Sequence, residues 1–265
     1  MRAPVRMNTA SKFTPETLLS IRPWAPNLFS FTMTRGSAFQ FVAGQFARLG
    51  VKRADPDNPK NPSGEKIVWR AYSVASPSQA RELEFFSVAI PDGEFSSELV
   101  RMVPGATVYL ERISYGFLTL ERFEPARDLW MLCTGTGLAP FLSILGETDA
   151  WSAFDNLIVV HSVRYPNELA YADEIRALSG KARLHYVPVV TRRHHPGALG
   201  ERVPALIESG ALESHVGLQI DRSASRVLIC GNPEMITATR KLLALRGLNP
   251  SRRGTPGQLA VENYW

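Results

Sequence analysis

The hydrophobic pattern of the chain changes near residue 126, and this change most constrains the fold. After it, short apolar runs alternate with segments of helical character, which predicts an α/β domain with a parallel sheet buried on both faces. The apolar runs are DLWMLCTG (128–135), NLIVVHSV (156–163), RLHYVPVVT (183–191) and RVLICG (226–231). The helical segments lie near 137–147, 167–179, 202–209 and 234–246.

The first half of the chain has a different rhythm, in which short β-rich runs are separated by turn residues. This spacing predicts an antiparallel sandwich or barrel. The runs are LFSFTMT (28–34), FQFVAGQFARLGV (39–51), IVWRAYSVAS (67–76), LEFFSVAI (83–90) and TVYLERI (107–113). Because the boundary falls at FEPARD (123–128), we expect an N-terminal domain over 1–125 and a C-terminal domain over 126–265.

The local sequence of two connecting segments in the first half predicts their structure. PDNPKNPSGEK (56–66) is polar and rich in turn residues, so we expect an exposed hairpin loop there. A short helix is expected after Gly93, with Ser96 or Ser97 as its cap.

Length and composition favour a two-domain protein of the cytoplasm. The chain has 265 residues, 45% of them hydrophobic and 21% charged, which is enough for a full core. Its two cysteines, Cys133 and Cys230, suit a reducing compartment and exclude a disulfide framework or a multi-cysteine metal site. We find neither a signal peptide nor an apolar run of about 18 residues, so no membrane association is expected.

Charge is distributed unevenly along the chain. From Lys181 onward there are 12 Lys and Arg against 6 Asp and Glu, whereas the first 180 residues carry 18 against 19. A basic second half suits nucleic acid, an acidic protein or a phosphorylated ligand. Arginines scattered for solubility are the alternative, and charge alone does not decide between them.

Two turns in the second half follow apolar strands and open helices. In GTGLAP (135–140), Gly135 and Gly137 allow a diphosphate to approach backbone N–H groups, although a tight turn is the alternative. In CGNP (230–233), Cys230 ends a strand where ligands of open α/β sheets gather. Taken alone, this cysteine is interpreted as a small buried hydrophobe.

The helix that follows CGNP has a strong start signal. Asn232 is a capping residue, Pro233 suits the first turn, and Glu234 faces the positive end of the helix dipole.

Further polar candidates follow the third strand of the second half. Arg192, Arg193 and Arg202 could clamp a phosphate ester, with a solvated basic face as the alternative. The histidines show no metal-ligand spacing, so we expect them to be structural or exposed and no metal to be bound.

The run WRAYSVASP (69–77) places polar side chains inside a predicted strand. In a strand, Arg70 and Tyr72 point to one face while Ser73 points to the other. An arginine beside an aromatic ring suits a ligand that is planar at one end and anionic at the other, with a cation–π pair as the alternative. GEFSS (93–97) adds a second possible anion site in the same half.

Taken together, these motifs resemble those of the ferredoxin–NADP⁺ reductases. W-R-A-Y-S resembles their R-x-Y-S flavin motif, and GEFS their G-x-x-S diphosphate site. TGTGLAPF resembles their pyridine-nucleotide motif, CGNPEM their C-G-x-x-x-M turn, and VENYW their terminal acid-x-aromatic sequence. The order and spacing agree over nearly the whole chain, and the short bacterial flavodoxin/ferredoxin–NADP⁺ reductases are the most similar branch.

The resemblance implies that the N-terminal domain is a β-barrel that binds FAD. It implies that Arg70 holds the flavin diphosphate, that Tyr72 stacks on the flavin and that Ser73 bonds near its N5 atom. The GEFS turn, through Gly93 and Ser96, would also serve the diphosphate.

The resemblance also implies roles for the C-terminus. Tyr264 would cover the opposite face of the flavin, and Trp265 would contact its adenine end. Thr136 would lie against the flavin and, with Cys230 and Glu262, line the nicotinamide pocket. Ser73, Cys230, Glu262 and Tyr264 are thus the expected catalytic residues.

The C-terminal domain would bind NADPH. Gly135, Gly137 and Arg164 would serve its diphosphate, and Arg192 with Arg202 its 2′-phosphate. The chain departs from the family in a longer polar segment over 52–66 and in Arg193 with the neighbouring histidines, so either arginine could carry the phosphate.

The implied activity is electron transfer between NADPH and a one-electron carrier, ferredoxin or flavodoxin, by a monomer. An oxygenase reductase with its own iron–sulfur centre needs four clustered cysteines, and this chain has two. A flavin subunit that binds no nicotinamide has no use for Arg192 and Arg202. A nucleic-acid-binding protein rests on basic charge alone, so no nucleic acid is expected as partner.

Overall fold

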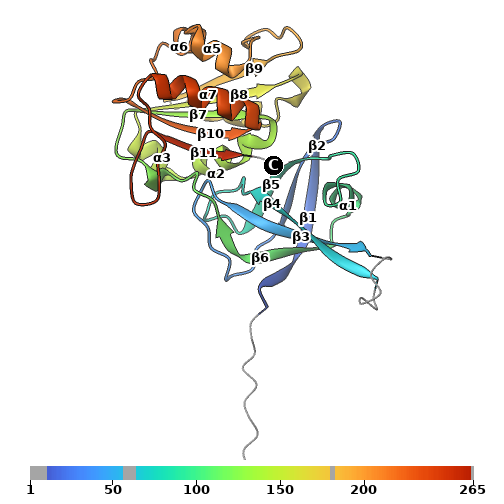
Figure 1. Cartoon of the computed structure of the whole chain (residues 1–265). Helices are drawn as coiled ribbons and strands as arrows, with labels where there is room; N and C mark the ends of the chain where they lie inside the picture. The colour runs from blue at the N-terminus through green and yellow to red at the C-terminus, as the bar shows by residue number, and fades with distance from the viewer. Residues whose placement is uncertain (1–10, 56–63, 180–182, 264–265) are drawn as a thin grey trace, which may run out of the picture.

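The computed structural model describes residues 11–55, 64–179 and 183–263, and it contains two sheets, one in each half of the chain (Figure 1). The predicted fold class is confirmed: an antiparallel barrel-like sheet precedes a parallel sheet flanked by helices. The strands are β1 (Phe13–Ala25), β2 (Leu28–Thr34), β3 (Phe46–Ala54), β4 (Glu65–Ser73), β5 (Glu82–Val88), β6 (Thr107–Tyr115), β7 (Asp128–Thr134), β8 (Asn156–Val163), β9 (Leu184–Val190), β10 (Ser225–Gly231) and β11 (Leu259–Asn263).

The N-terminal sheet has the order β4-β3-β6-β1-β2-β5 and rolls up until its ends meet. An isolated bridge between Val74 and Phe85 joins the continuation of β4 to β5. The backbone N–H of Ala75 donates to the carbonyl of Glu84 at 2.8 Å beside it. Closure surrounds a core of large side chains, among them Phe31, and removes most of the exposed strand edge.

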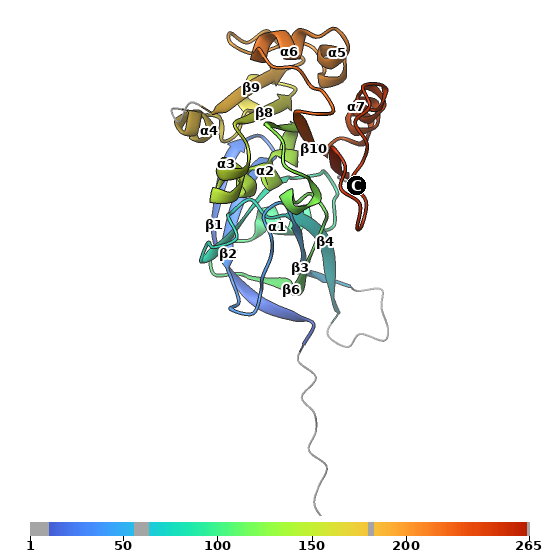
Figure 2. The ribbon, with the colours of Figure 1, turned by 90° about the vertical axis from the view of Figure 1, so that its left-hand side faces the viewer.

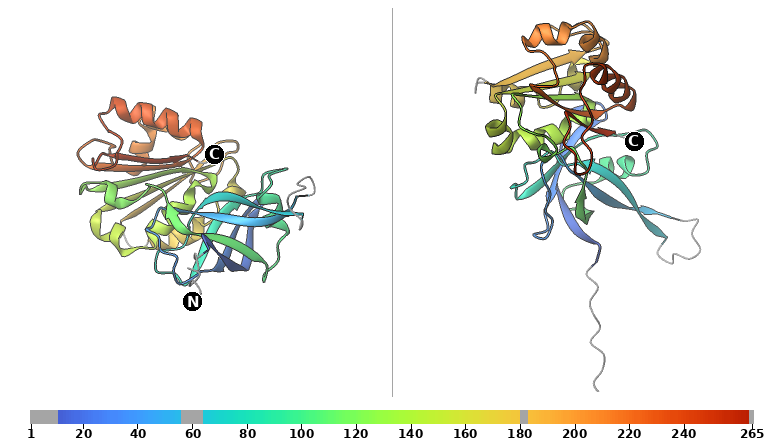
Figure 3. Two further views of the ribbon diagram at one scale, coloured as in Figure 1. Left: turned by 60° about the horizontal axis from the view of Figure 1, so that its bottom comes forward. Right: turned by 60° about the vertical axis from the view of Figure 1, so that its left-hand side comes forward.

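The C-terminal sheet is parallel throughout, with the order β11-β10-β7-β8-β9. One face packs against α5, α6 and α7. The other packs against α2, α3 and α4, and its apolar cluster takes in barrel residues at the domain contact, among them Ala75, Phe86 and Leu118. The core inside the barrel is a separate cluster. Figure 3 shows the two sheets from two further sides, with the parallel sheet lying against the barrel. The helices are α1 (Ser96–Arg101), α2 (Ala139–Leu145), α3 (Thr148–Ala153), α4 (Ala172–Ser179), α5 (Val203–Glu208), α6 (Ala211–Val216) and α7 (Pro233–Leu245), with single turns η1 (Leu120–Arg122), η2 (Gly135–Leu138) and η3 (Pro166–Glu168).

Strand order fixes where a ligand site is expected. The chain leaves β7 toward β8 and β9 on one side and returns to β10 and β11 on the other, which makes the carboxyl ends of β7 and β10 the switch point of the sheet. These ends face the barrel, and β11 runs toward the junction between the domains (Figure 1).

The predicted strands over 28–34 and 156–163 agree with β2 and β8 to the residue. Two strands, β1 and β11, are missing from the sequence prediction. Pro15 and Pro23 stand inside β1, and proline in a strand normally argues against one. β11 is short, at five residues, and gives little pattern to read.

Two local predictions were wrong. The run over 39–51 is a strand only from Phe46, because Gly44 has φ +95° and turns the chain against the carbonyl of Leu118. Neither Ser96 nor Ser97 caps α1, whose N-cap is Phe95. Instead the Ser96 hydroxyl accepts the N–H of Ile90 at 3.0 Å. Most of the predicted loop over 56–66, namely 56–63, lies outside the described residues.

The segment that connects the two sheets is held in place by Arg226 of the C-terminal domain. The buried Arg226 guanidinium donates to the carbonyls of Glu124 and Pro125, each at 3.0 Å. The predicted boundary between residues 125 and 126 falls in this anchored stretch and stays a prediction.

In the described part of the chain, no helix is long and apolar enough to cross a lipid bilayer.

The N-cap of α7 gives a stability prediction. The Asn232 side chain accepts the N–H groups of Glu234 at 2.9 Å and Met235 at 3.1 Å, as the sequence predicted. Asn232→Ala should lower the free energy of unfolding by about 1 kcal/mol, whereas Asn232→Asp should preserve it because aspartate accepts the same bonds. Denaturant unfolding measures both, and equal losses in the two variants would contradict a capping role.

Candidate active site

A hydrogen bond between the two domains marks the centre of the candidate site. The Ser73 hydroxyl, at the end of β4, donates to Glu262 Oε1 on β11 at 2.9 Å. Gly116 lies beside the same carboxylate, since a Cβ on it would stand 2.9 Å from Glu262 Oε2. A residue with a side chain at this position would therefore push the carboxylate away from Ser73.

The Glu262 carboxyl group is tuned by its surroundings. Burial raises its pKa to about 7, and the Ser73 hydrogen bond opposes that rise by favouring the ionised form. The carboxyl group therefore exchanges its proton near neutral pH. A titrating acid at the mouth of a sheet's switch point is a frequent property of active sites.

Glu262 is the first member of a row that crosses the sheet in register. Glu262 pairs with Cys230, Cys230 with Cys133, and Cys133 with His161. Burial raises the pKa of the Cys133 thiol, which donates to the carbonyl of Val160 at 3.4 Å. Burial lowers the pKa of His161 to about 4, so both groups are neutral at physiological pH. The row forms an uncharged floor beside Glu262.

Two tight turns interlock at the switch point. Gly135 has φ +51°, and Gly137 lies so close to Cys230 that a Cβ would collide with its carbonyl oxygen. The Thr134 hydroxyl accepts the N–H of Asn232 at 2.8 Å and ties the turn after β7 to the turn after β10. The predicted GTGL and CGNP turns therefore form one backbone-lined surface next to the Cys230–Glu262 pair.

The expected flavin platform is built around Tyr72. Its ring is mostly buried, with its centroid 5.2 Å from that of Phe95, and its hydroxyl accepts the Ser87 Oγ hydrogen at 3.2 Å. Burial raises the pKa of this phenol. Arg70, one pleat earlier on β4, is exposed, and one of its terminal nitrogens lies 3.8 Å from the Glu94 carboxylate. Ring and guanidinium thus line the same face, as predicted.

The Gly93–Ser96 turn closes the end of this platform. A Cβ on Gly93 would stand 2.7 Å from Ser96 Oγ, so the turn accepts only glycine without rearrangement. Ser96 is buried, and its hydroxyl is engaged by the backbone of Ile90. The turn therefore offers backbone groups at its surface while the serine stabilises it from inside.

Arg164 and Arg192 follow the carboxyl ends of the neighbouring strands β8 and β9. The N–H of Arg192 donates to the carbonyl of Arg164 at 2.9 Å, which places these residues side by side. The Arg164 guanidinium pairs with Glu168 at 2.8 Å. Arg192, Arg193 and Arg202 are all exposed, and Arg202 stands at the N-cap of α5.

Some predicted residues are not placed, and some site residues were not predicted. Tyr264 and Trp265 lie outside the described residues. Thr136 belongs to the η2 turn. Sequence reasoning missed Cys133 and Gly116. Cys133 could have been found, because it precedes the GTGL turn at the strand end just as Cys230 precedes its own turn, but no sequence signal singles out Gly116.

Comparison with known proteins places this site in a family. Residues 131–241 match the model described as an oxidoreductase NAD-binding domain. The chain is 37% identical over 248 residues to the flavodoxin/ferredoxin–NADP reductase of Escherichia coli (strain K12), an alignment that covers 92% of this chain and 96% of that protein. It is 35% identical over 260 residues to ferredoxin–NADP reductase A of Sorangium cellulosum, with 94% and 89% covered. The chain belongs to the ferredoxin–NADP reductase family.

A solved structure agrees with this assignment. The fold superposes with a TM-score of 0.88 on a ferredoxin NADP⁺ reductase from Neisseria gonorrhoeae, a crystal structure with bound FAD and NADP. That protein is 39% identical, and the match covers 96% of this chain and all of the other. The family and the two-domain fold implied by the sequence motifs are thereby confirmed.

The raised pKa of Glu262 predicts a pH dependence of stability. Because the folded carboxyl group holds its proton more tightly than the unfolded one, its contribution is complete below about 4.5 and is lost as pH rises to about 7. Glu262→Gln removes this contribution but keeps an acceptor for Ser73. The difference in unfolding free energy, wild type minus variant, should therefore fall over this range, by at most about 1.4 kcal/mol per pH unit.

Denaturant titrations at several pH values measure this difference, in which the other titrating groups cancel. A difference that does not change between pH 4.5 and 7 would show that Glu262 keeps an ordinary pKa.

Proposed function

We propose that this protein is an FAD-dependent reductase that carries electrons between NADPH and a one-electron carrier, ferredoxin or flavodoxin. The observation that carries the proposal is the meeting of Ser73, from the flavin-motif strand, with Glu262 and Cys230 at the switch point of the nucleotide-type sheet. Membership of the reductase family supports the same activity.

The residues of the barrel fit an FAD molecule. Tyr72 offers a ring held in place by aromatic neighbours, and Arg70 offers an exposed guanidinium on the same face for the diphosphate. The Gly93 turn has no room for a Cβ and leaves backbone groups accessible. The Ser73 hydroxyl, which donates to Glu262, would lie near the reacting end of the flavin.

The residues of the C-terminal domain fit NADPH. The interlocked turns carry no side chain at Gly135 and Gly137, so a diphosphate could approach their backbone N–H groups closely. Arg192 and Arg202 are exposed and available for a 2′-phosphate. Arg164 would serve the NADPH diphosphate, Thr136 would lie against the flavin, and Tyr264 with Trp265 would cover the flavin and its adenine end.

Bound FAD would accept two electrons as hydride from NADPH and release them singly to the carrier. The protein's own residues position the reactants and control protons. Cys230 would give the nicotinamide an uncharged, close-packed floor, supported from beneath by the buried Cys133 of the neighbouring strand. Glu262 and Ser73 hold a proton between them at the domain junction, where burial keeps the Glu262 pKa near neutrality.

The test is the visible absorption of the purified protein before and after anaerobic addition of NADPH. One FAD per chain and bleaching of the flavin band are expected. A protein that stays colourless after reconstitution with FAD, or whose bound flavin is not bleached, would contradict the proposed function.

Discrimination between NADPH and NADH is predicted to depend on Arg192 and Arg202. Losing a charged contact costs roughly 1.5–3 kcal/mol, on the order of ten- to a hundredfold in affinity. Arg192→Ala/Arg202→Ala should therefore remove most of the preference in steady-state kinetics with the two nucleotides. The control Arg252→Ala/Arg253→Ala loses the same charge in the turn before β11, on the opposite edge of the sheet, and should retain the preference. If the first double variant discriminates as wild type does, Arg193 becomes the next candidate.

The carrier is proposed to dock beside the Ser73–Glu262 junction. Phe117 follows Gly116 directly and is 64% exposed, which is unusual for a large aromatic side chain. The Arg122 guanidinium lies over its ring, 4.3 Å from the centroid. An aromatic anchor beside a cation fits an acidic electron carrier.

Phe117→Ala should slow carrier reduction roughly five- to thirtyfold, the effect of losing 1–2 kcal/mol at an interface, because it removes the anchor. The control Leu245→Ala removes an apolar side chain at the far end of α7 that is even more exposed, at 86%, and should leave carrier reduction unchanged. Carrier reduction should also slow with rising ionic strength more than reduction of a small neutral acceptor does. Equal rates in the two variants would exclude Phe117 from the docking surface.

A cytoplasmic location and a monomeric state remain predictions.

A further inference from the structure

Tyr171 is a residue of the C-terminal domain that is buried in the contact with the barrel. It stands immediately before α4 and has φ +59°, a backbone conformation that residues with a Cβ rarely adopt. Its carbonyl accepts the N–H of Ile175 at 2.9 Å and so begins the helix. Such a conformation persists only where the surroundings hold it, and it occurs often at functional positions.

The Tyr171 ring is held by two aromatic side chains of the barrel. Its centroid lies 4.4 Å from that of Trp24 on β1 and 5.2 Å from that of Phe86 on β5, the latter edge to face. Arg22 covers Trp24 at 3.6 Å and pairs with Glu174 of α4 at 2.8 Å. α4 lies at the edge of the C-terminal domain above the ends of β1 and β2 (Figure 2). The ring contacts therefore hold this edge against the barrel, and the exposed ion pair adds a weaker contact.

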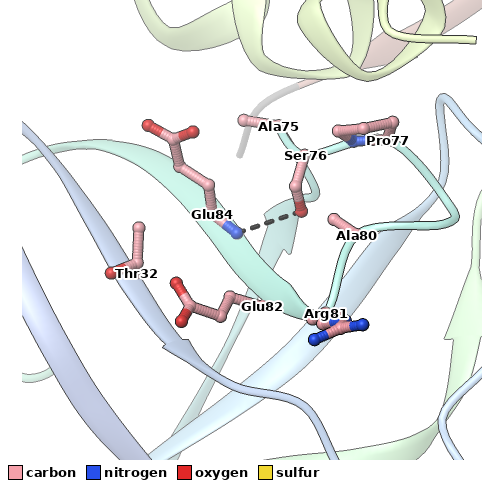
Figure 4. Close-up of a pocket in the computed structure, with 8 residues that line it drawn as sticks. All are labelled: Thr32, Ala75, Ser76, Pro77, Ala80, Arg81, Glu82 and Glu84. Carbon is pink, nitrogen blue, oxygen red and sulfur yellow. Dashed lines mark hydrogen bonds between the residues drawn. The ribbon is translucent and has the colours of Figure 1, made fainter.

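The Tyr171 hydroxyl reaches β5, the strand that pairs with the continuation of the flavin-platform strand β4. It donates to Glu84 Oε1 at 2.7 Å. The backbone N–H of Glu84 donates in turn to Ser76 Oγ at 3.1 Å, beside a cavity of about 400 Å³ (Figure 4). Ser76 follows Ser73 by three residues, and its carbonyl accepts the hydroxyl of Ser143 on α2 at 2.8 Å.

The other end of the Tyr171 segment carries a proposed nucleotide contact. Glu168, three residues before Tyr171, accepts both the backbone N–H of Arg164 at 2.9 Å and its guanidinium at 2.8 Å. Tyr171 therefore holds the segment from Arg164 to Tyr171 against the barrel. This is the segment proposed to present Arg164 to the nucleotide. Its contacts and the Ser73–Glu262 bond tie the two domains at separate places.

We propose that Tyr171 is a positioning residue that sets the orientation of the nucleotide domain on the flavin barrel, and through it the alignment for hydride transfer. This inference rests on the proposed function. Transfer requires the reacting atoms to be held within about 3–3.5 Å, and a displacement of 1 Å costs up to about a hundredfold in rate. The Tyr171 contacts lie at a different place in the interface from the Ser73–Glu262 bond, so they constrain a rotation about that bond which the shared apolar cluster alone resists less specifically.

The test compares the anaerobic single-turnover reduction of the flavin by NADPH in wild type, Tyr171→Phe and Tyr171→Ala. Tyr171→Ala should lower the limiting rate roughly ten- to a hundredfold with little change in the NADPH concentration for half-saturation and with FAD retained. Tyr171→Phe keeps the ring and loses the hydroxyl, so it should be slowed less. Reduction by a small chemical reductant should be equal in all three, because it needs no domain alignment.

Leu243→Ala separates positioning from stability. Leu243 belongs to α7 and is fully buried against the face of the sheet that points away from the barrel, so its truncation should lower the melting temperature without slowing hydride transfer. A wild-type limiting rate in Tyr171→Ala would overturn the proposal. So would a fall of the limiting rate in both Tyr171→Ala and Leu243→Ala in proportion to their loss of melting temperature, because general destabilisation would then explain both. An increase in the half-saturating concentration at an unchanged limiting rate would also overturn it. If Tyr171→Ala does not retain FAD, the same criteria apply to Tyr171→Phe. A wild-type protein that NADPH does not reduce would instead refute the proposed function.

Discussion

The site depends on the contact between two domains that are each incomplete alone. Ser73 belongs to the barrel and Glu262 to the last strand of the parallel sheet, yet one donates a hydrogen bond to the other at 2.9 Å. The apolar cluster beneath them is continuous, because it contains Leu118 and Ala75 of the first half together with Cys133 and Cys230 of the second. Burial by this shared core raises the pKa of Glu262 to about 7. A domain separated from its partner would therefore lose both the geometry and the proton affinity of the site.

Glycine makes the close approach of these elements possible. Gly116 leaves room for the Glu262 carboxylate, and Gly137 lets the turn after β7 touch the turn after β10. The result is a junction in which backbone groups and small side chains surround a few polar atoms. Such a surface accommodates flat, anionic nucleotides, because little protein has to move to admit them.

Much of this arrangement could be predicted from sequence, for identifiable reasons. The α/β half was recognisable because buried parallel strands leave unbroken apolar runs, and Asn232 could be read as a cap from its neighbours alone. Arg70 and Tyr72 were placed on one face by the two-residue period of a strand. The motifs then allowed roles to be assigned through a family resemblance, and family and fold were confirmed, while those individual roles remain proposals.

The rest depended on contacts between distant parts of the chain. β1 was not predicted, because its prolines contradict the usual strand signal. Its buried Glu16 is satisfied by hydrogen bonds from the Thr14 and Thr34 hydroxyls, and Thr34 lies on the neighbouring strand. The sequence prediction placed Tyr171 inside a helix near 167–179, and only the contact of its ring with Trp24, far earlier in the sequence, shows its position between the domains. Nothing local identifies Gly116 as the neighbour of Glu262. These features belong to the packing of one domain on the other, which no local pattern records.

The most direct test of this account is a double-mutant cycle on the rate of flavin reduction by NADPH, using Ser73→Ala, Glu262→Gln and the combined variant. Because the two side chains form one hydrogen-bonded unit, the account predicts that each single variant slows the reaction and that the double variant is little slower than either. Independent effects that multiply in the double variant, or wild-type rates in all of them, would contradict a joint role for Ser73 and Glu262 at the domain junction.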